Sequence, residues 1–252
     1  MTILPVGAAS RPEDSLRNWP TKLGKLPLVA LLALAACGGA ADPSRLAIRE
    51  ESSPALAALA APSTAGAALL LAGDLAGARA SYEAALASDP DQLAALNDLA
   101  VGYFLDGHVD AARRLLDEVV ASGSPRQQQA ALLNLGALYA VEGHATAAQA
   151  YLETASGLDL ARPEPLYALA LLADSRGDWS AARTALREAL RLDDGTARAG
   201  FAFPFREGRR HLDALLADQA GDTVAAAAAW RELAQGRFPA LASQAQRHLA
   251  GP

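Results

Sequence analysis

Five glycines recur at nearly constant spacing along the chain and constrain its fold more than any other feature. They interrupt apolar stretches at Gly73, Gly107, Gly143, Gly177 and Gly221, and successive glycines lie 34, 36, 34 and 44 residues apart. A period near 34 residues is typical of a unit built from a helix, a turn and a second helix. Glycine allows the backbone conformation that such a turn needs. The spacing therefore predicts a stack of about five helical hairpins.

Small and large apolar residues recur at fixed distances from these glycines. A leucine precedes a small residue at Leu99-Ala100, Leu135-Gly136 and Leu169-Ala170. The alanines that follow the glycines are Ala78, Ala112, Ala148, Ala182 and Ala226, and the large apolar residues after them are Tyr82, Leu116, Leu152, Leu186 and Trp230. Small side chains let two helices approach closely, and large ones fill the space between them. Over residues 59–239 this pattern resembles that of tetratricopeptide repeats.

The resemblance implies an all-α fold, a helical-hairpin solenoid of about five repeats. Residues 240–252 are expected to form a C-terminal capping helix, because a solenoid has to cover its last apolar face. Composition agrees, since alanine and leucine dominate the hydrophobic residues while aromatic residues make up only 5%. Alanine and leucine are strong helix formers. The repeat is irregular at residues 122–127, where two residues are added, and before the fifth unit, where ten are added.

The first 36 residues are typical of a secretory signal. Residues 26–36 are uncharged and apolar and follow Lys22 and Lys25. As a helix this run spans about 16 Å, roughly half of a bilayer's hydrocarbon core, so it is too short for a transmembrane helix. The long leader is unusual, and a start nearer Leu23 is the alternative.

The apolar run ends at Leu34-Ala35-Ala36-Cys37-Gly38, which resembles the lipobox of bacterial lipoproteins. The resemblance implies that residues 1–36 are removed and that Cys37, the only cysteine, carries the lipid, palmitate included. Residues 37–58 are then the lipidated N-terminus and a tether. Acyl chains on one cysteine form a firm membrane anchor. The alternative is a buried thiol at the end of a core helix.

Charge and motifs argue against several function classes. The chain has a net charge of −6, of which residues 1–36 contribute +2, so the remainder carries −6 − 2 = −8. An acidic domain repels phosphate backbones, so no nucleic-acid binding is expected. We find no phosphate-binding loop, nucleophile elbow or metal-ligand cluster, and therefore predict no catalysis, cofactor, metal or small-molecule substrate. His108 and His144 occupy equivalent turns and are interpreted as turn residues.

In the tetratricopeptide family the first helix of each unit lines a concave face that binds other proteins. Mapped onto this chain, the resemblance implies a largely apolar groove formed by Asn97, Val101, Phe104, Leu105, Leu133, Ala137, Val141, Tyr167, Leu171 and Asp174. Such a groove fits an amphipathic helix or an extended hydrophobic segment. Phe104 and Tyr167 are expected to be exposed anchors. The alternative, most evenly balanced for Leu105 and Leu133, is that these side chains belong to the core.

Three phenylalanines lie close together in the insertion before the fifth unit, at Phe201, Phe203 and Phe205. Two interpretations stay open at this point. The insertion either folds onto the solenoid and covers a gap left by an irregular unit, or forms a docking or membrane-touching loop.

These features predict a lipid-anchored scaffold of the bacterial cell envelope, placed at the outer membrane and facing the periplasm. The architecture is similar to that of pilotins, the tetratricopeptide lipoproteins that help secretins of type IV pili to assemble. Scaffolds of motility, division or wall synthesis have the same architecture, so the likeness is one of association only. The alternatives are a regulator of a cell-wall-processing enzyme and, if the signal is not used, a cytoplasmic adaptor.

Overall fold

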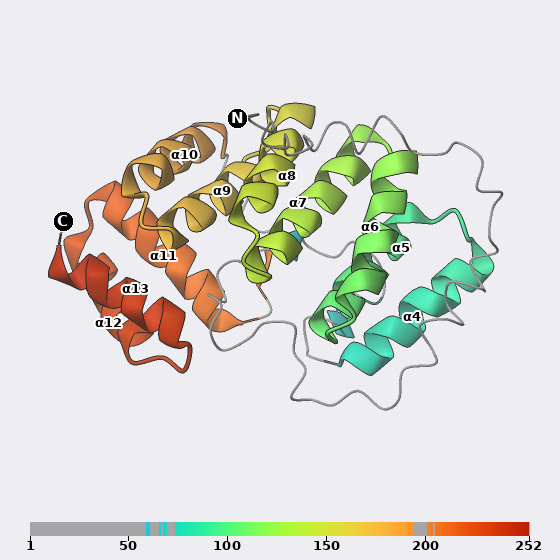
Figure 1. The fold of residues 1–252 in the computed structure, drawn as a ribbon, viewed down its shortest axis with the longest axis horizontal. Coiled ribbons are helices and arrows are strands. Elements are labelled where there is room, and N and C mark those ends of the chain that lie inside the picture. Colours follow the sequence, from blue (N-terminus) through green and yellow to red (C-terminus); the bar gives the residue numbers. More distant parts are fainter. Residues whose placement is uncertain are drawn as a thin grey trace, which may run out of the picture. The chain divides into compact units, whose positions relative to one another are not determined.

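The computed structural model describes residues 59–60, 66, 68–69, 74–193, 201–203 and 205–251, and helices dominate this part of the chain (Figure 1). The helices with defined bounds are α4 (Leu75–Ser88), α5 (Leu93–Leu105), α6 (Val109–Ser122), α7 (Pro125–Val141), α8 (Ala145–Leu158), α9 (Glu164–Ser175), α10 (Trp179–Leu192), α11 (Arg206–Ala220), α12 (Thr223–Ala234) and α13 (Pro239–Ala250). Two short strands, β1 (Leu59–Ala60) and β2 (Phe201–Ala202), pair antiparallel, with Leu59 opposite Ala202.

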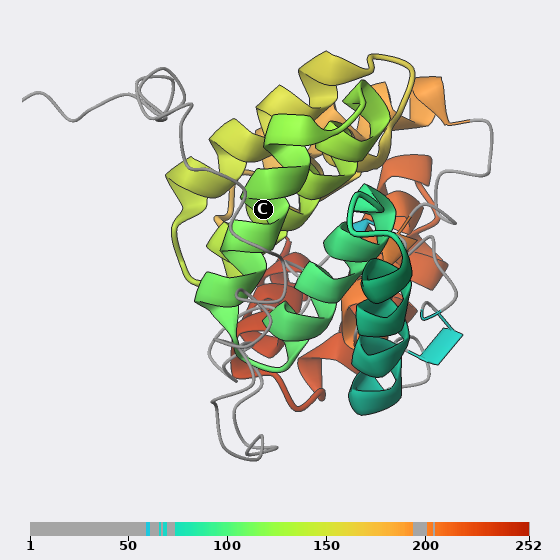
Figure 2. The same cartoon turned by 90° about the vertical axis from the view of Figure 1, so that its right-hand side faces the viewer.

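Helices that follow one another in the chain pack against each other as helical hairpins. The pairs are α5 with α6, α7 with α8, α9 with α10 and α11 with α12, while α4 packs on α5 and α13 packs on α12. Each first helix also contacts the next first helix, which links α5, α7, α9 and α11. In Figure 2 the successive helices can be followed by colour from α5, in blue-green, to α8, in yellow-green. The expected all-α fold, a solenoid of helical hairpins, is confirmed.

The turn glycines have the backbone conformation that the repeat pattern predicts. Gly107, Gly143, Gly177 and Gly221 have φ angles of 82°, 86°, 76° and 75°, a left-handed region that side chains with a Cβ rarely adopt. The residue after each glycine donates its backbone N–H to a carbonyl five residues earlier, as His108 does to Tyr103 at 2.8 Å. This pattern satisfies the end of the first helix and reverses the chain.

The residue after each turn glycine is the N-cap of the second helix. Where that residue is aspartate, its carboxylate accepts a backbone N–H three residues later at 2.9 Å, as at Asp74, Asp178 and Asp222. His108 and His144 make no such bond, and their rings pack against Tyr103 and Tyr139 at centroid distances of 5.9 and 6.2 Å. Both histidines are therefore turn residues that pack locally.

The recurrent small and large residues form the core between the helices. The alanines at 78, 112, 148, 182 and 226 are buried, as are the large residues Tyr82, Leu116, Leu152, Leu186 and Trp230. At Gly136 a Cβ atom would lie 2.6 Å from Cδ2 of Leu152. The small residue is therefore required, because the two helices of that hairpin approach more closely than a larger side chain allows.

Residues 59 and 60, which the sequence pattern includes in the repeat array, are extended rather than helical. They pair with residues 201 and 202 of the insertion and lie against α7. A contact between segments so distant in the chain leaves no periodic signal in the sequence.

Candidate interaction face

The residues predicted to bind a partner lie on α5, α7 and α9, the first helices of three successive hairpins, which we call the first-helix face. All ten are buried in the structure: Asn97, Val101, Phe104, Leu105, Leu133, Ala137, Val141, Tyr167, Leu171 and Asp174. The prediction that Phe104 and Tyr167 are exposed is wrong, since they are 2% and 0% exposed. The hydroxyl of Tyr167 donates to Asp193 Oδ2 at 2.7 Å, which ties α9 to the end of α10.

At the N-terminal end of this face, a chain of hydrogen bonds joins β1 to α7 and α5. The backbone N–H of Ala60 donates to Asn134 Oδ1 at 2.8 Å, and Asn134 Nδ2 donates to Asn97 Oδ1 at 3.0 Å. Asn97 Nδ2 in turn donates to Asp98 Oδ1 at 3.3 Å. We call Asn134, Asn97 and Asp98 the amide relay. All three residues are buried, and so is Leu59 beside them.

The relay has a direction. A backbone N–H can only donate, so Asn134 presents its oxygen to Ala60 and its NH₂ group to Asn97. Asn97 in turn presents its oxygen to Asn134 and its NH₂ group to Asp98. The end of the relay is therefore an acceptor, and the group that it holds is a backbone N–H.

At the C-terminal end of the face, Asp174 of α9 ties three helices together through what we call the carboxylate cluster. Its Oδ2 accepts from His211 Nε2 of α11 at 2.7 Å and from Gln244 Nε2 of α13. Its Oδ1 accepts from His248 Nε2, also of α13, at 2.9 Å. Burial opposes ionisation of Asp174, but hydrogen bonds from His211 and His248 hold its pKa below its usual value.

Aromatic rings complete the carboxylate cluster. The His248 ring stacks on Trp230 with centroids 4.0 Å apart and planes 4° apart, and it lies 5.2 Å from Trp179. The indole N–H of Trp230 donates to Asp218 Oδ2 at 2.7 Å. Within the described residues, the cluster does not have the arrangement of three or more ligands that a metal ion requires. It is built to hold α13 against the array.

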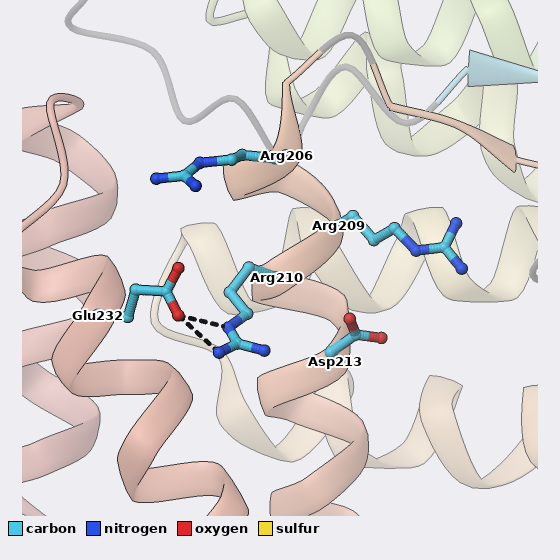
Figure 3. A pocket seen from close by; sticks show the side chains of 5 residues that line it. All are labelled: Arg206, Arg209, Arg210, Asp213 and Glu232. Carbon is cyan, nitrogen blue, oxygen red and sulfur yellow. Dashed lines mark hydrogen bonds and ion pairs between the residues drawn. The ribbon is translucent and has the colours of Figure 1, made fainter.

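A group of arginines lies at the start of α11. Arg206, Arg209 and Arg210 line a surface pocket with Asp213 and Glu232, and Figure 3 shows Arg210 directed toward Glu232. Arg210 Nε donates to Glu232 Oε2 at 2.9 Å. This ion pair joins α11 to α12 at an exposed position, where such pairs contribute about 0–1 kcal/mol. In the regular units, leucines occupy the positions that correspond to Arg210 and Asp213. In this unit Arg210 is exposed and Asp213 is half-buried.

The insertion phenylalanines are partly accounted for by local packing. Phe201 belongs to β2, which pairs with β1. Phe205 contacts Phe238 with ring centroids 5.2 Å apart, and Arg237 lies over both rings. Phe203 and Phe205 are half-buried. This arrangement favours the interpretation that the insertion folds onto the array, at the junction with the start of α13.

The proposed anchor, Cys37, and the apolar run before it lie outside the described residues. In the part of the chain that the structure describes, no helix combines the length and the apolar character needed to cross a membrane.

Several residues of these two sites could not be chosen from the sequence. Asn134 stands inside the apolar run Leu132-Leu133-Asn134-Leu135, and a lone amide in such a run is the only signal that pointed to it. His211, Gln244 and His248 carry no comparable signal, because their shared partner, Asp174, is up to 74 residues away.

The sequence was compared with known families, curated proteins and solved structures. The tetratricopeptide repeat family model matches residues 69–136, in agreement with the helical hairpins of that segment. Two solved structures of MamA are similar at 21% identity each. One has a TM-score of 0.42 and covers 75% of this chain and 98% of its own, and the other has a TM-score of 0.40 and covers 74% and 91%. No curated protein matches the sequence.

Proposed function

We propose that this chain is a lipid-anchored scaffold of the bacterial cell envelope that binds other proteins through its helical array. The observation that carries the binding role is the amide relay, which holds the backbone of an extended segment at Ala60 on the first-helix face. Proteins bind extended peptides by hydrogen bonds to the peptide main chain and by pockets for its side chains. Here the side chain of Asn134 bonds the main chain of Ala60, and the Leu59 side chain is buried.

The anchoring role rests on sequence. Leu34-Ala35-Ala36-Cys37-Gly38 resembles a lipobox, and Cys37 is the only cysteine. In this proposal residues 1–36 are removed, lipid on Cys37 inserts into the outer membrane, and residues 37–58 tether the array in the periplasm. By similarity of architecture, the partner class that we favour is an assembling secretin of a type IV pilus or motility system, which would make the chain a pilotin-like factor.

Intact-mass analysis of the protein extracted from membranes tests the anchor, with Cys37→Ser as the matched variant. We expect lipid mass on a chain that begins at Cys37, and release of the variant into the soluble fraction. An unmodified full-length chain would contradict the anchor and favour a cytoplasmic adaptor.

Co-purification from detergent-solubilised envelopes tests the partner class. A secretin oligomer bound to the wild-type protein supports the pilotin-like role. Recovery of a cell-wall hydrolase or synthase in its place would reject that role in favour of a regulator of wall-processing enzymes.

A further inference from the structure

We propose that the amide relay is a recognition site for one extended, uncharged peptide strand, that Leu59–Ala60 of the chain itself is its resident occupant, and that a partner segment enters by exchange with β1. This inference rests on the proposed protein-binding function and names the kind of segment that the first-helix face accepts.

The occupant must offer a backbone N–H. The relay ends in an acceptor, Asn134 Oδ1, because the NH₂ group of Asn134 is already bonded to Asn97, and Ala60 N lies 2.8 Å from that oxygen. A helical segment donates its backbone N–H groups internally, so it has none to offer except in its first turn. An extended strand leaves alternate N–H groups available. The relay therefore selects a strand and disfavours the amphipathic helix that a tetratricopeptide groove also allows.

The side chains around the relay define which strand fits. Leu59 is 1% exposed and Ala60 7% exposed, so one apolar side chain is enclosed next to a position that holds only a methyl group. The flanking sequence Ala55-Leu56-Ala57-Ala58-Leu59-Ala60-Ala61 has no charge. A charged residue at the position of Ala60 would be buried against α7 without a partner, at a high desolvation cost.

The described part of the resident strand is short. Within the described residues, β1 pairs with β2 in the register Leu59–Ala202 and Ala60–Phe201, and a two-residue ladder contributes little by itself. A neutral hydrogen bond such as that from Ala60 to Asn134 contributes modestly because water replaces it when it breaks. A partner strand that repeats the same contacts exchanges with β1 at small net cost. β1 thus lowers the apparent affinity for partners, since a tethered segment competes at high effective concentration.

A titration on the full-length chain tests the exchange. The probe is a fluorescently labelled peptide with the sequence of residues 55–64, Ala-Leu-Ala-Ala-Leu-Ala-Ala-Pro-Ser-Thr, followed by anisotropy. Ala60→Pro removes the N–H that Asn134 accepts and keeps residue 59 extended. We expect this variant to bind the probe at least about tenfold more tightly than the wild type, because the tethered competitor is weakened.

Two further variants locate the binding. Asn134→Leu in the Ala60→Pro background should abolish probe binding, whereas Gln149→Leu, which changes an exposed amide on α8, should leave it unchanged. Equal affinity of the wild type and Ala60→Pro, or binding that survives Asn134→Leu, would overturn the proposal.

A second measurement does not depend on a variant folding. Hydrogen exchange of the wild-type Ala60 amide should be slow, and saturating unlabelled peptide should accelerate it at this residue. No acceleration under saturation would reject exchange at this site. Neither readout depends on Cys37, so failure of the lipid anchor and failure of strand exchange are distinguished.

Discussion

The two ends of the first-helix face are closed by different chemistry. At the N-terminal end the amide relay holds β1 by one hydrogen bond from Ala60 to the neutral amide of Asn134. At the C-terminal end the buried carboxylate of Asp174 holds α13 and α11 by three hydrogen bonds, two of them from histidines. Each end therefore covers a part of the face with a segment that is distant in sequence.

The chemistry of each end determines whether the segment that covers it, β1 or α13, can be exchanged for another. A neutral amide loses little when water or another N–H replaces its donor. A buried carboxylate that loses its donors is left as an unpaired charge, which costs far more. We therefore interpret the carboxylate cluster as a fixed closure of the array and the amide relay as the end where a partner binds.

Removal of the Asp174 carboxylate is expected to have the largest effect. Asp174→Ala leaves His211, Gln244 and His248 without their shared acceptor, and breaking such a buried group costs about 3–5 kcal/mol of unfolding free energy. Urea unfolding monitored by circular dichroism measures the loss. Asp110→Ala, at a position 84% exposed, is the control and should change stability by about 0.5 kcal/mol or less. A loss at Asp174 as small as that of the control would contradict a fixed closure.

Acid should also lower the free energy of unfolding through the carboxylate cluster. The decrease should be no larger than that caused by Asp174→Ala. The native pKa of Asp174 is lowered from its usual value, so its ionised form contributes stability above the unfolded pKa, near about 4. That contribution is lost as pH falls below this value toward the lower native pKa. In Asp174→Asn the fall should be shallower, as urea midpoints across a pH series will show. Parallel curves for the two proteins would mean that Asp174 is not the group responsible. His211 and His248 contact Asp174, and Asp218 lies 3.8 Å from His248 Nδ1; all three of these groups are retained in the Asp174→Asn variant.

The sequence predicted the hairpins but not the state of the face that they form. The turns at Gly107, Gly143 and Gly177 are set by local sequence, so their spacing can be recognised without the structure. Whether Phe104 and Tyr167 are exposed depends on which neighbouring helix or distant segment covers them. The sequence periodicity is the same whether they are exposed or covered. The pairing of Leu59–Ala60 with residues 201–202 likewise depends on tertiary contact alone.

A smaller effect is expected at the amide relay. Asn134→Leu leaves the N–H of Ala60 and the oxygen of Asn97 without their partner, at a cost of about 1–3 kcal/mol. Hydrogen exchange should show increased exchange in β1 and α5, with no change in α11 to α13. Equal loosening of both ends would contradict the separation of the two closures.

The smallest effect on global stability is expected from Ala60→Pro. It removes one neutral hydrogen bond, and because water reaches Asn134 Oδ1 once β1 detaches, the cost is about 1 kcal/mol. Thermal unfolding should show a small shift in Tm with the helical signal intact. A shift as large as that of Asp174→Ala would mean that β1 is a structural part of the array and not an exchangeable occupant.

The exchange rate of the Ala60 amide in the full-length wild-type protein decides whether the amide relay holds a strand. We expect a protected amide in the wild type that becomes unprotected in Asn134→Leu, while amides of α9 to α13 exchange equally slowly in both proteins. An Ala60 amide that exchanges as freely in the wild type as in an unfolded peptide would show that the relay holds no strand.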